Sequence, residues 1–416
     1  MNGAGERIAG NVQTQAWHTS PRRKFDICDR MVWFGNQRRA RQMITSMHIE
    51  NFKCFKEFDI ELGPFNVLIG PNGSGKSSLL DAVRIGGDLR PGSNRPDNLH
   101  SGKFWSPLGT EFREPLIHPD RIWTWMKREN LRVELRIYGR EGRGPTQPYQ
   151  HIRSGDGIVF RSFVAVDEEP IPEKEQDQWY DETVGRVGYY RFAPESLKCP
   201  SLLTNELTND GHGFPGYLIH ILSTDRPVFE RIVREFCRRF PEYTDITMPS
   251  VNVTPHPQRG ESEMPGRGKE ETYRLFLKLR QQNDIDLDAE DVSDGQIVCL
   301  AFIALSCISA RPNILLVEEP ENWIHHASLK EIVRTLKHLS DDKGVQVILT
   351  THSPYLLDHV EPEEVFVFSK GEDGAVRAKK FSDHPDVETL RKHFKTGELW
   401  TGFDEKDIVE GKGKFE

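Results

Sequence analysis

Eight residues from Gly70 to Ser77, GPNGSGKS, have the types and spacing of a phosphate-binding loop. They fit the pattern GxxxxGK[ST], in which backbone N–H groups surround a phosphate chain at the start of a helix. Glycine suits this loop because any Cβ there obstructs the phosphate. The candidate nucleotide-binding residues are Gly70, Pro71, Asn72, Gly73, Ser74, Gly75, Lys76, Ser77 and Ser78.

A pair of carboxylates follows an apolar run much later in the chain. NILLVEEPEN, residues 313–322, indicates a buried parallel strand that ends in Glu318 and Glu319. Ligands of open α/β sheets bind at the carboxyl ends of such strands. Because successive strand side chains point in opposite directions, one carboxylate can face a metal ion and the other an attacking water. A solvated acidic turn is the alternative, but it leaves three glutamates beside a buried strand without a cause.

A histidine ends a second strand of the same kind. VQVILTTHSPYLLD predicts a strand over Val345–Leu349 and a helix that starts at Pro354. His352 lies between them, where an imidazole can donate a hydrogen bond to the γ-phosphate of a nucleotide. A lone histidine is more often a structural residue, but its place at a strand end favours the functional interpretation.

The segment DVSDGQIVCLAFIALS predicts a helix that begins after Ser293. The free N–H groups of this helix start can face an anion. Because Lys76 and its loop hold the chain's own phosphate, the anion we expect is the nucleotide of a second subunit. An ordinary capped core helix explains Ser293 but not Gly295, which costs about 1 kcal/mol relative to alanine inside a helix.

These groups need strands and helices to position them. FNVLI before the glycine loop predicts a strand, and SSLLDAV after it predicts a helix. The longest apolar run, IVCLAFIALSCIS, is too short to span a bilayer and indicates a buried helix. Further strands are expected in MITSMHIENFKCFKEFDIEL, LRVELRIYGR and GIVFRSFVAV, and one or two amphipathic helices in GYLIHILSTDRPVFERIVREFCRRF.

Together these motifs resemble those of the ABC-type ATPases of the RecF, SMC and OLD group, and specifically the short OLD-related AAA family ATPases that lack a Toprim nuclease domain. IGPNGSGKSS matches the Walker A motif, VSDGQ the signature, ILLVEEPE the Walker B motif and TTHSPYLLD the switch-histidine segment. The resemblance covers residues 43–403. It implies an α/β P-loop NTPase fold: an ABC-type head with a mixed sheet, an N-terminal antiparallel β subdomain and an α-helical insertion.

The resemblance also implies roles for single residues. Lys76 holds the β- and γ-phosphates of ATP, and Ser77 and Glu318 bind Mg²⁺. Glu319 polarises the attacking water and His352 contacts the γ-phosphate. Ser293, Asp294 and Gly295 close over the ATP of the other protomer in a head-to-tail homodimer.

Some positions depart from the family pattern. Glu318 replaces the aspartate of many relatives, and Trp323 and His326 stand near the D-loop where small residues and proline are more usual. Gln147 and Gln150 lie in a Pro/Gly-rich stretch and do not qualify as the Q-loop glutamine. That role therefore stays unassigned.

The motifs and composition divide the chain into five parts. Residues 1–42, with eight Lys/Arg against three Asp/Glu, indicate a disordered tail; a basic arm for nucleic acid is the alternative. Residues 43–90 and 270–370 form the two halves of the ATPase, 91–269 an insertion with strands and a helical lobe, and 371–416 a closing strand and helix. Because 18 of the 26 prolines lie between Pro91 and Pro265, that insertion is not a coiled coil.

Composition limits the partners. The net charge of −9 means that any DNA contact must use a local patch. On the second amphipathic helix, Arg231, Arg234, Arg238 and Arg239 offer one, which could face a phosphate backbone, a partner's acidic surface or only solvent. The six cysteines have no CxxC spacing, so neither zinc nor a disulfide framework is indicated, and a reducing cytoplasm is expected.

The sequence leaves more than one function open. We favour a cytoplasmic, Mg²⁺-dependent ATPase whose ATP-bound dimer regulates a DNA-directed effector in phage defence or DNA repair. Only 64 residues follow His352, too few for a Toprim domain, so nuclease activity is expected from a separate protein. A slowly hydrolysing nucleotide-switched scaffold is the alternative. A transporter ATPase is less favoured, and no NKxD segment indicates a GTPase.

Overall fold

The computed structural model describes residues 43–88, 187–253, 270–280, 285–308 and 311–412, together with the backbone of seven short strands between 104 and 170. These residues belong to the unit Arg41–Glu416. The tail predicted over residues 1–42 lies outside the described residues.

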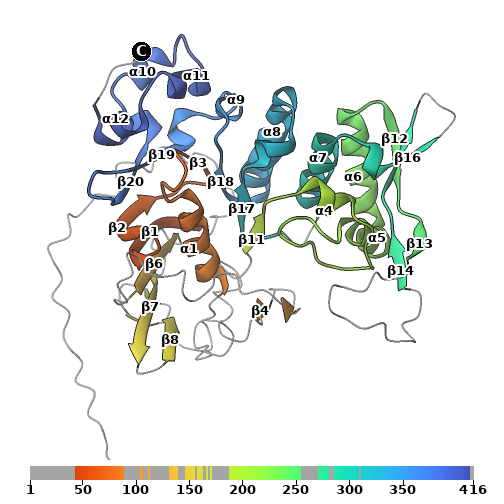
Figure 1. The fold of residues 1–416 in the computed structure, drawn as a ribbon, viewed down its shortest axis with the longest axis horizontal. Helices are drawn as coiled ribbons and strands as arrows, with labels where there is room; N and C mark the ends of the chain where they lie inside the picture. Colours follow the sequence, from red (N-terminus) through yellow and green to blue (C-terminus); the bar gives the residue numbers. More distant parts are fainter. Residues whose placement is uncertain are drawn as a thin grey trace, which may run out of the picture. The chain divides into compact units, whose positions relative to one another are not determined.

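The N-terminal part forms an antiparallel sheet (Figure 1). β1 (Met43–Phe52) pairs with β2 (Phe55–Glu61) on one side and with β6 (Leu131–Tyr138) on the other. The sheet continues through β7 (Thr146–Ser154), β8 (Gly157–Ser162), β9 (Ala165–Val166) and β10 (Glu169–Pro170). Separately, β4 (Phe104–Trp105) pairs with β5 (Glu111–Phe112). The strands predicted here are confirmed, and β7 includes the stretch that holds Gln147 and Gln150.

One histidine makes this sheet sensitive to pH. The His48 ring contacts Asp59 of the facing strand and Glu50, each at 2.8 Å. The hydrogen bond to Asp59 is the main cause that raises the pKa of His48 to about 9 from 6.5, against the opposing effect of burial. The charged imidazole therefore stabilises the folded state fully below pH 6.5, and this contribution is lost as pH rises through 9.

We expect the free energy of unfolding to fall by about 1–2 kcal/mol between pH 6 and pH 9.5, a value reduced because Asp59 is largely exposed to solvent. Urea denaturation measures it. In His48→Gln this decrease should be absent, because glutamine does not titrate. If the free energy of unfolding falls equally with pH in wild type and in His48→Gln, the prediction is contradicted.

A second, mixed sheet carries the motifs. Its order is β11-β17-β18-β3-β19-β20, and all neighbours are parallel except β19 and β20. The strands are β11 (Val187–Tyr190), β17 (Ile314–Glu318), β18 (Gln346–Thr350), β3 (Phe65–Ile69), β19 (Val365–Lys370) and β20 (Val376–Lys380). The strands expected at FNVLI, ILLVE and VQVIL are thus confirmed, the last shifted by one residue.

The three central strands are buried on both faces, which explains their continuous apolar runs. Alternate residues enter two separate cores: Val67 and Ile69 pack with the helices on one face, and Leu68 packs with β1, β2 and α1 (Lys76–Asp88) on the other. The strands cannot slide by one residue without exchanging these two sets. This fixes the relative heights of the strand ends, where the functional side chains lie.

Helices supply most of the first core. α7 (Asp294–Cys307) is apolar on all sides and almost entirely buried, as its sequence predicts. It packs against α8 (His326–Lys343) and against α6 (Arg226–Arg239). The other helices are α4 (Pro194–Lys198), α5 (Phe214–Thr224), α9 (Pro354–Leu357), α10 (Val387–Leu390), α11 (Thr396–Thr401) and α12 (Glu405–Glu410).

Short strands accompany the helical part of the chain. β12 (Tyr243–Thr247) pairs with β15 (Phe276–Leu279), which pairs with β16 (Asp286–Asp288), and β13 (Ser250–Val253) pairs with β14 (Glu270–Tyr273). The described residues also form short 3₁₀ turns at Ala289–Asp291, Pro320–Trp323, Pro362–Glu364 and Phe381–Asp383. The predicted class is confirmed: an α/β fold with a mixed sheet, an N-terminal antiparallel β part and helices between its halves.

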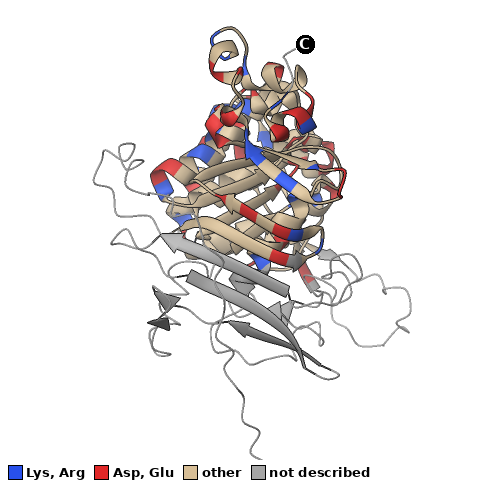
Figure 2. Ribbon diagram, turned by 90° about the vertical axis from the view of Figure 1, so that its left-hand side faces the viewer, with Lys and Arg blue, Asp and Glu red and all other residues tan. Residues whose placement is uncertain are grey.

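The four arginines predicted as a basic patch, Arg231, Arg234, Arg238 and Arg239 of α6, do not form one free basic face. Arg239 is held by Glu331 at 3.2 Å and by Thr335 at 3.0 Å, both on α8. Arg238 pairs with Glu235 of its own helix. The Nε of Arg231 is buried, and Arg234 is exposed and has no ion pair with another described residue. Figure 2 shows Lys and Arg interspersed with Asp and Glu over the described elements.

Two further features bear on the protein's setting. In the part of the chain that the structure describes, no helix combines the length and apolarity needed to cross a membrane. The five described cysteines, Cys54, Cys199, Cys237, Cys299 and Cys307, are free thiols.

Candidate nucleotide site

The glycine loop follows β3 directly and has backbone angles that require glycine. Gly70 has φ of 137°, and a Cβ on it would lie 2.2 Å from the carbonyl oxygen of Phe368. Gly73 and Gly75 also have positive φ, at 74° and 107°. The loop is therefore shaped by its backbone, and residues 71–73 at its outer turn are exposed.

Lys76 and Ser77 begin α1 at the end of this loop. Lys76 is 6% exposed, and its ammonium donates to the carbonyl oxygens of Gly70 and Pro71 at 2.7 and 3.0 Å. Burial lowers its pKa, against the opposing charges of neighbouring glutamates, Glu319 first. The hydroxyl of Ser74 is buried inside the loop and has no hydrogen-bond partner among the described residues. The glycine-rich backbone of the loop and the nearby ammonium make a cradle that fits a phosphate chain.

Glu318 is the last residue of β17 and is 8% exposed. Its carboxylate accepts hydrogen bonds from the Ser77 hydroxyl and from the Tyr189 hydroxyl on β11. Burial, and then this hydrogen bond, raises the pKa of Tyr189. Arg84 of α1 lies over the Tyr189 ring, 4.0 Å from its centroid. The longer side chain of glutamate thus still reaches Ser77.

Glu319 does not continue the strand, contrary to the expectation of alternating strand side chains. It has left-handed backbone angles, φ 47° and ψ 57°, and precedes a 3₁₀ turn. Its N–H donates to the Thr350 carbonyl oxygen of β18 at 3.1 Å. The two carboxylates have different partners, and a left-handed non-glycine residue is uncommon enough to indicate a local constraint at Glu319.

Three side chains converge on the Glu319 carboxylate. Asn322 donates to Oε2 at 3.0 Å, and the Arg191 guanidinium lies 3.4 Å from the same oxygen. The His352 Nε2 lies 3.7 Å from Oε1. Burial, followed by the charge of Lys76, lowers the pKa of His352, so that its neutral form is favoured at neutral pH.

Glu321 fixes the end of the histidine strand. Its Oε1 accepts from the His352 N–H and from the Thr351 hydroxyl, both at 2.7 Å. Burial raises the pKa of this carboxyl group. The third glutamate of EEPE therefore ties the turn after β17 to the end of β18, and so sets the position of His352 relative to Glu319.

The predicted signature residues start α7. Ser293 is its N-cap residue, but its side chain is exposed and makes no capping hydrogen bond. The Asp294 carboxylate pairs with the buried Lys198 ammonium at 2.6 Å. A Cβ on Gly295 would lie 3.0 Å from the Trp323 carbonyl oxygen. The close Trp323 carbonyl oxygen gives a reason within the chain for a small residue at this position, so the glycine alone does not indicate a second subunit.

The structure brings most of the predicted residues together. Hydrogen bonds and ion pairs link Ser77, Glu318, Glu319 and His352 with their neighbours, and the pKa of Lys76 responds to both glutamates. Among the described residues, no hydrogen bond or ion pair joins Ser293–Gly295 to the glycine loop. Sequence reasoning missed Tyr189, Arg191 and Glu321, although a Tyr-Tyr-Arg run after an apolar position and the third acid of EEPE were visible signals.

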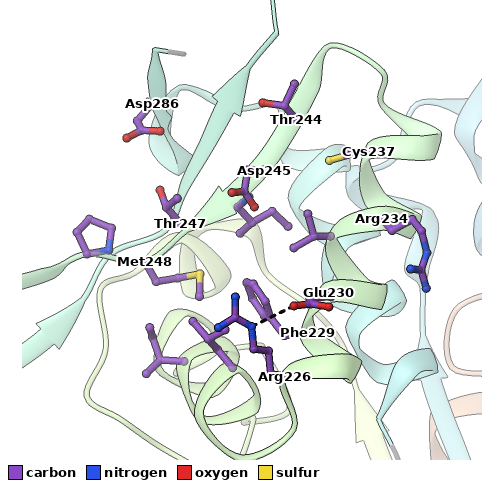
Figure 3. A pocket seen from close by; sticks show the side chains of 15 residues that line it. Arg226, Phe229, Glu230, Arg234, Cys237, Thr244, Asp245, Thr247, Met248 and Asp286 are labelled. Atoms are coloured by element: carbon purple, nitrogen blue, oxygen red, sulfur yellow. Dashed lines mark hydrogen bonds and ion pairs between the residues drawn. The ribbon is translucent and has the colours of Figure 1, made fainter.

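A separate hollow of about 780 Å³ lies elsewhere, between α5, α6 and β12 (Figure 3). Its walls mix apolar side chains such as Phe229 and Met248 with charged ones such as Arg226 and Glu230, which pair at 3.0 Å. No candidate nucleotide-binding or catalytic residue lines it.

The central sheet and the side chains at its strand ends define a P-loop ATPase of the type shared by ABC, SMC and RecF proteins. A family described as "AAA domain, putative AbiEii toxin, Type IV TA system" matches residues 65–118 and 91–358. This chain belongs to that family. A second description, "AAA ATPase domain", matches residues 43–85.

Similar proteins agree with this class. An OLD nuclease of Thermus scotoductus is 22% identical over 380 residues, which cover 85% of this chain and 68% of that protein. The RecF protein of Vibrio vulnificus is 48% identical over 48 residues, 11% of this chain and 13% of that protein. An SMC head bound to the C-winged helix domain of ScpA aligns over 81% of this chain and 97% of that one, at 15% identity and a TM-score of 0.49, too low to add to the assignment.

Proposed function

We propose that this protein is a Mg²⁺-dependent ATPase that dimerises head to tail around two ATP molecules and controls a separate DNA-directed effector. The observation that carries the proposal is the meeting of Lys76, Glu319 and His352 at neighbouring strand ends of one sheet. A lysine for the phosphates, a carboxylate for the water and a hydrogen-bonding imidazole are the groups that hydrolysis of a terminal phosphate requires.

The chemistry divides among these residues. The loop N–H groups and Lys76 hold the β- and γ-phosphates, and the ammonium offsets negative charge that develops in the transition state. Glu319 accepts a proton from the attacking water. His352, neutral because of its lowered pKa, donates from its ring to the γ-phosphate.

The arrangement of Ser77 and Glu318 fits a magnesium ion. Their oxygens are already hydrogen-bonded to each other, so both can approach one cation between them. Among the described residues no group of three His, Cys, Asp or Glu side chains is suited to a metal. This agrees with magnesium sites that combine one or two protein oxygens with water and substrate phosphate. When bound, the ion neutralises phosphate charge and orients the terminal phosphate.

Exposed groups beside the site support a second copy as partner. Trp323 and Tyr355 are large aromatic side chains that are 42% and 60% exposed. His326 lies between them: it follows the 3₁₀ turn that ends at Trp323, and its ring centroid is 5.5 Å from that of Tyr355. The exposed Ser293 belongs to the helix that contacts the same turn. In the proposed dimer, these surfaces face the nucleotide bound to the other subunit.

The cellular role follows by analogy with the relatives. OLD nuclease and the DNA replication and repair protein RecF carry DNA-related names. We infer that this chain acts in the cytoplasm on a DNA-directed effector, such as a nuclease, in phage defence or DNA repair. Contact of this chain itself with DNA is not needed for that role, and the paired arginines of α6 do not favour it.

The dependence of the ATPase rate on protein concentration tests the shared site. We expect the rate per subunit to rise with concentration and to saturate as dimers form, since each site needs two chains. Light scattering on the same samples reports the oligomeric state. A constant rate per subunit in a monomeric sample contradicts the proposal.

A further inference from the structure

The edge strand β11 places two polar side chains beside the two carboxylates. β11 runs parallel to β17, with Tyr190 opposite Val317. Tyr189 lies opposite Leu316, and its hydroxyl reaches Glu318 two residues further along β17. Arg191, two residues after Tyr189, reaches Glu319. The Arg191 N–H donates to the Asn209 carbonyl oxygen at 2.8 Å, which fixes the backbone just after the strand.

The ion pair between Arg191 and Glu319 is weak enough to open when a stronger partner binds. The guanidinium side chain is 59% exposed and lies 3.4 Å from the carboxylate, a long and solvated ion pair that contributes little stability. Glu319 keeps Asn322 as a hydrogen-bond donor when this pair opens. The terminal phosphate held by Lys76 must lie within reach of the same carboxylate, since Glu319 activates the water that attacks it. This phosphate is therefore also close to Arg191.

A terminal phosphate is the stronger partner for arginine. It carries more charge than one carboxylate, and it accepts two parallel N–H bonds from a guanidinium. We propose that Arg191 is a positioning residue that leaves Glu319 for the γ-phosphate of ATP, and so releases the general base only when that phosphate is present. This inference rests on the proposed function, because it assumes that ATP occupies the loop and that Glu319 is the base.

The same segment is anchored to the start of α7. Seven residues after Arg191, the buried ammonium of Lys198 donates to the Val292 carbonyl oxygen at 2.9 Å and pairs with Asp294 at 2.6 Å. α4 ends at Lys198 and so lies between Arg191 and Lys198 in the chain. If Arg191 moves toward the phosphate, α4 and Lys198 transmit the movement to the start of α7, which the proposed dimer uses. Recognition of the γ-phosphate is thus linked to the subunit interface.

Equilibrium binding separates this role from a structural one. We would titrate fluorescent ribose-labelled ADP and the β,γ-imido analogue of ATP into wild type, Arg191→Ala, Arg191→Lys and the control Arg226→Ala. Arg226 also pairs with a glutamate, but its exposed side chain lies at the start of α6 and touches none of the candidate site residues. We expect Arg191→Ala to weaken binding of the ATP analogue about tenfold and leave ADP binding unchanged. The lysine variant should recover part of the loss.

A double variant tests the exchange of partners. Glu319→Gln removes the carboxylate that competes for Arg191, so the ATP analogue should bind several-fold tighter than to wild type. In Glu319→Gln with Arg191→Ala, that gain should vanish. Equal losses for ADP and the ATP analogue, or a gain that persists in the double variant, overturn the inference alone. If wild type binds neither nucleotide, the proposed function itself fails.

Discussion

Glu319→Gln should lower the steady-state rate of ATP hydrolysis by about 10²- to 10⁴-fold without loss of ATP binding. Glutamine keeps the size of the side chain and can still accept from Asn322, but it cannot take a proton from water. The substituted protein should then accumulate as an ATP-bound dimer, because the step that opens it is blocked. Phosphate release measures the rate, and light scattering after size exclusion measures the dimer.

The matched control is Glu388→Gln. Glu388 is exposed and pairs with Arg391 at 3.3 Å on a different part of the chain, so its neutralisation should leave the rate unchanged. A Glu319→Gln protein that hydrolyses ATP within about threefold of wild type would show that another group activates the water. The assignment of the general base would then have to move.

The sequence was sufficient for the strands that carry the site. β3, β17 and β18 are apolar runs that stop at polar residues, and such runs are typical of strands buried on both faces. Since parallel strands present their carboxyl ends at one edge, the meeting of Glu319 with His352 followed from two separate segments. The loop from Gly70 could be predicted because its glycines are needed for its backbone conformation and not for packing.

The contacts of the edge strand could not be predicted in the same way. β11 has only four residues, none fully buried, and its partner strand lies more than one hundred residues later. Periodicity does not identify so short a half-exposed strand. The roles of Tyr189 and Arg191 therefore emerge only from the register that places them beside Glu318 and Glu319.

Two other residues show why local patterns mislead. Gly295 is small because the Trp323 carbonyl approaches it within the same chain, which no sequence spacing reveals. Arg239 has the helical spacing of an exposed basic face, yet α8 supplies Glu331 and Thr335 to it. In both cases a tertiary neighbour decides the role of the residue, so an argument from one helix alone was incomplete.

Ser293→Glu should strongly lower the rate of ATP hydrolysis, and mixing this variant with Glu319→Gln subunits should restore part of that rate. The side chain of Ser293 is exposed and unbonded at the N-cap of α7, and a carboxylate near a helix start is favourable, so the variant should fold. In the dimer its charge would face the phosphates bound to the other subunit. We expect a loss of about 100-fold in rate, whereas the same change at the exposed Ser223, near the end of α5, should have no such effect.

Mixing inactive Ser293→Glu and Glu319→Gln subunits before ATP is added tests whether each site uses two chains. In a mixed dimer one site combines the intact loop and Glu319 of the first subunit with the intact helix start of the second, while the other site carries both defects. Random pairing should therefore restore about a quarter of the wild-type rate per subunit. A self-contained site predicts only the sum of the two inactive samples. Recovery in the mixture thus distinguishes a shared site from a complete one within each chain.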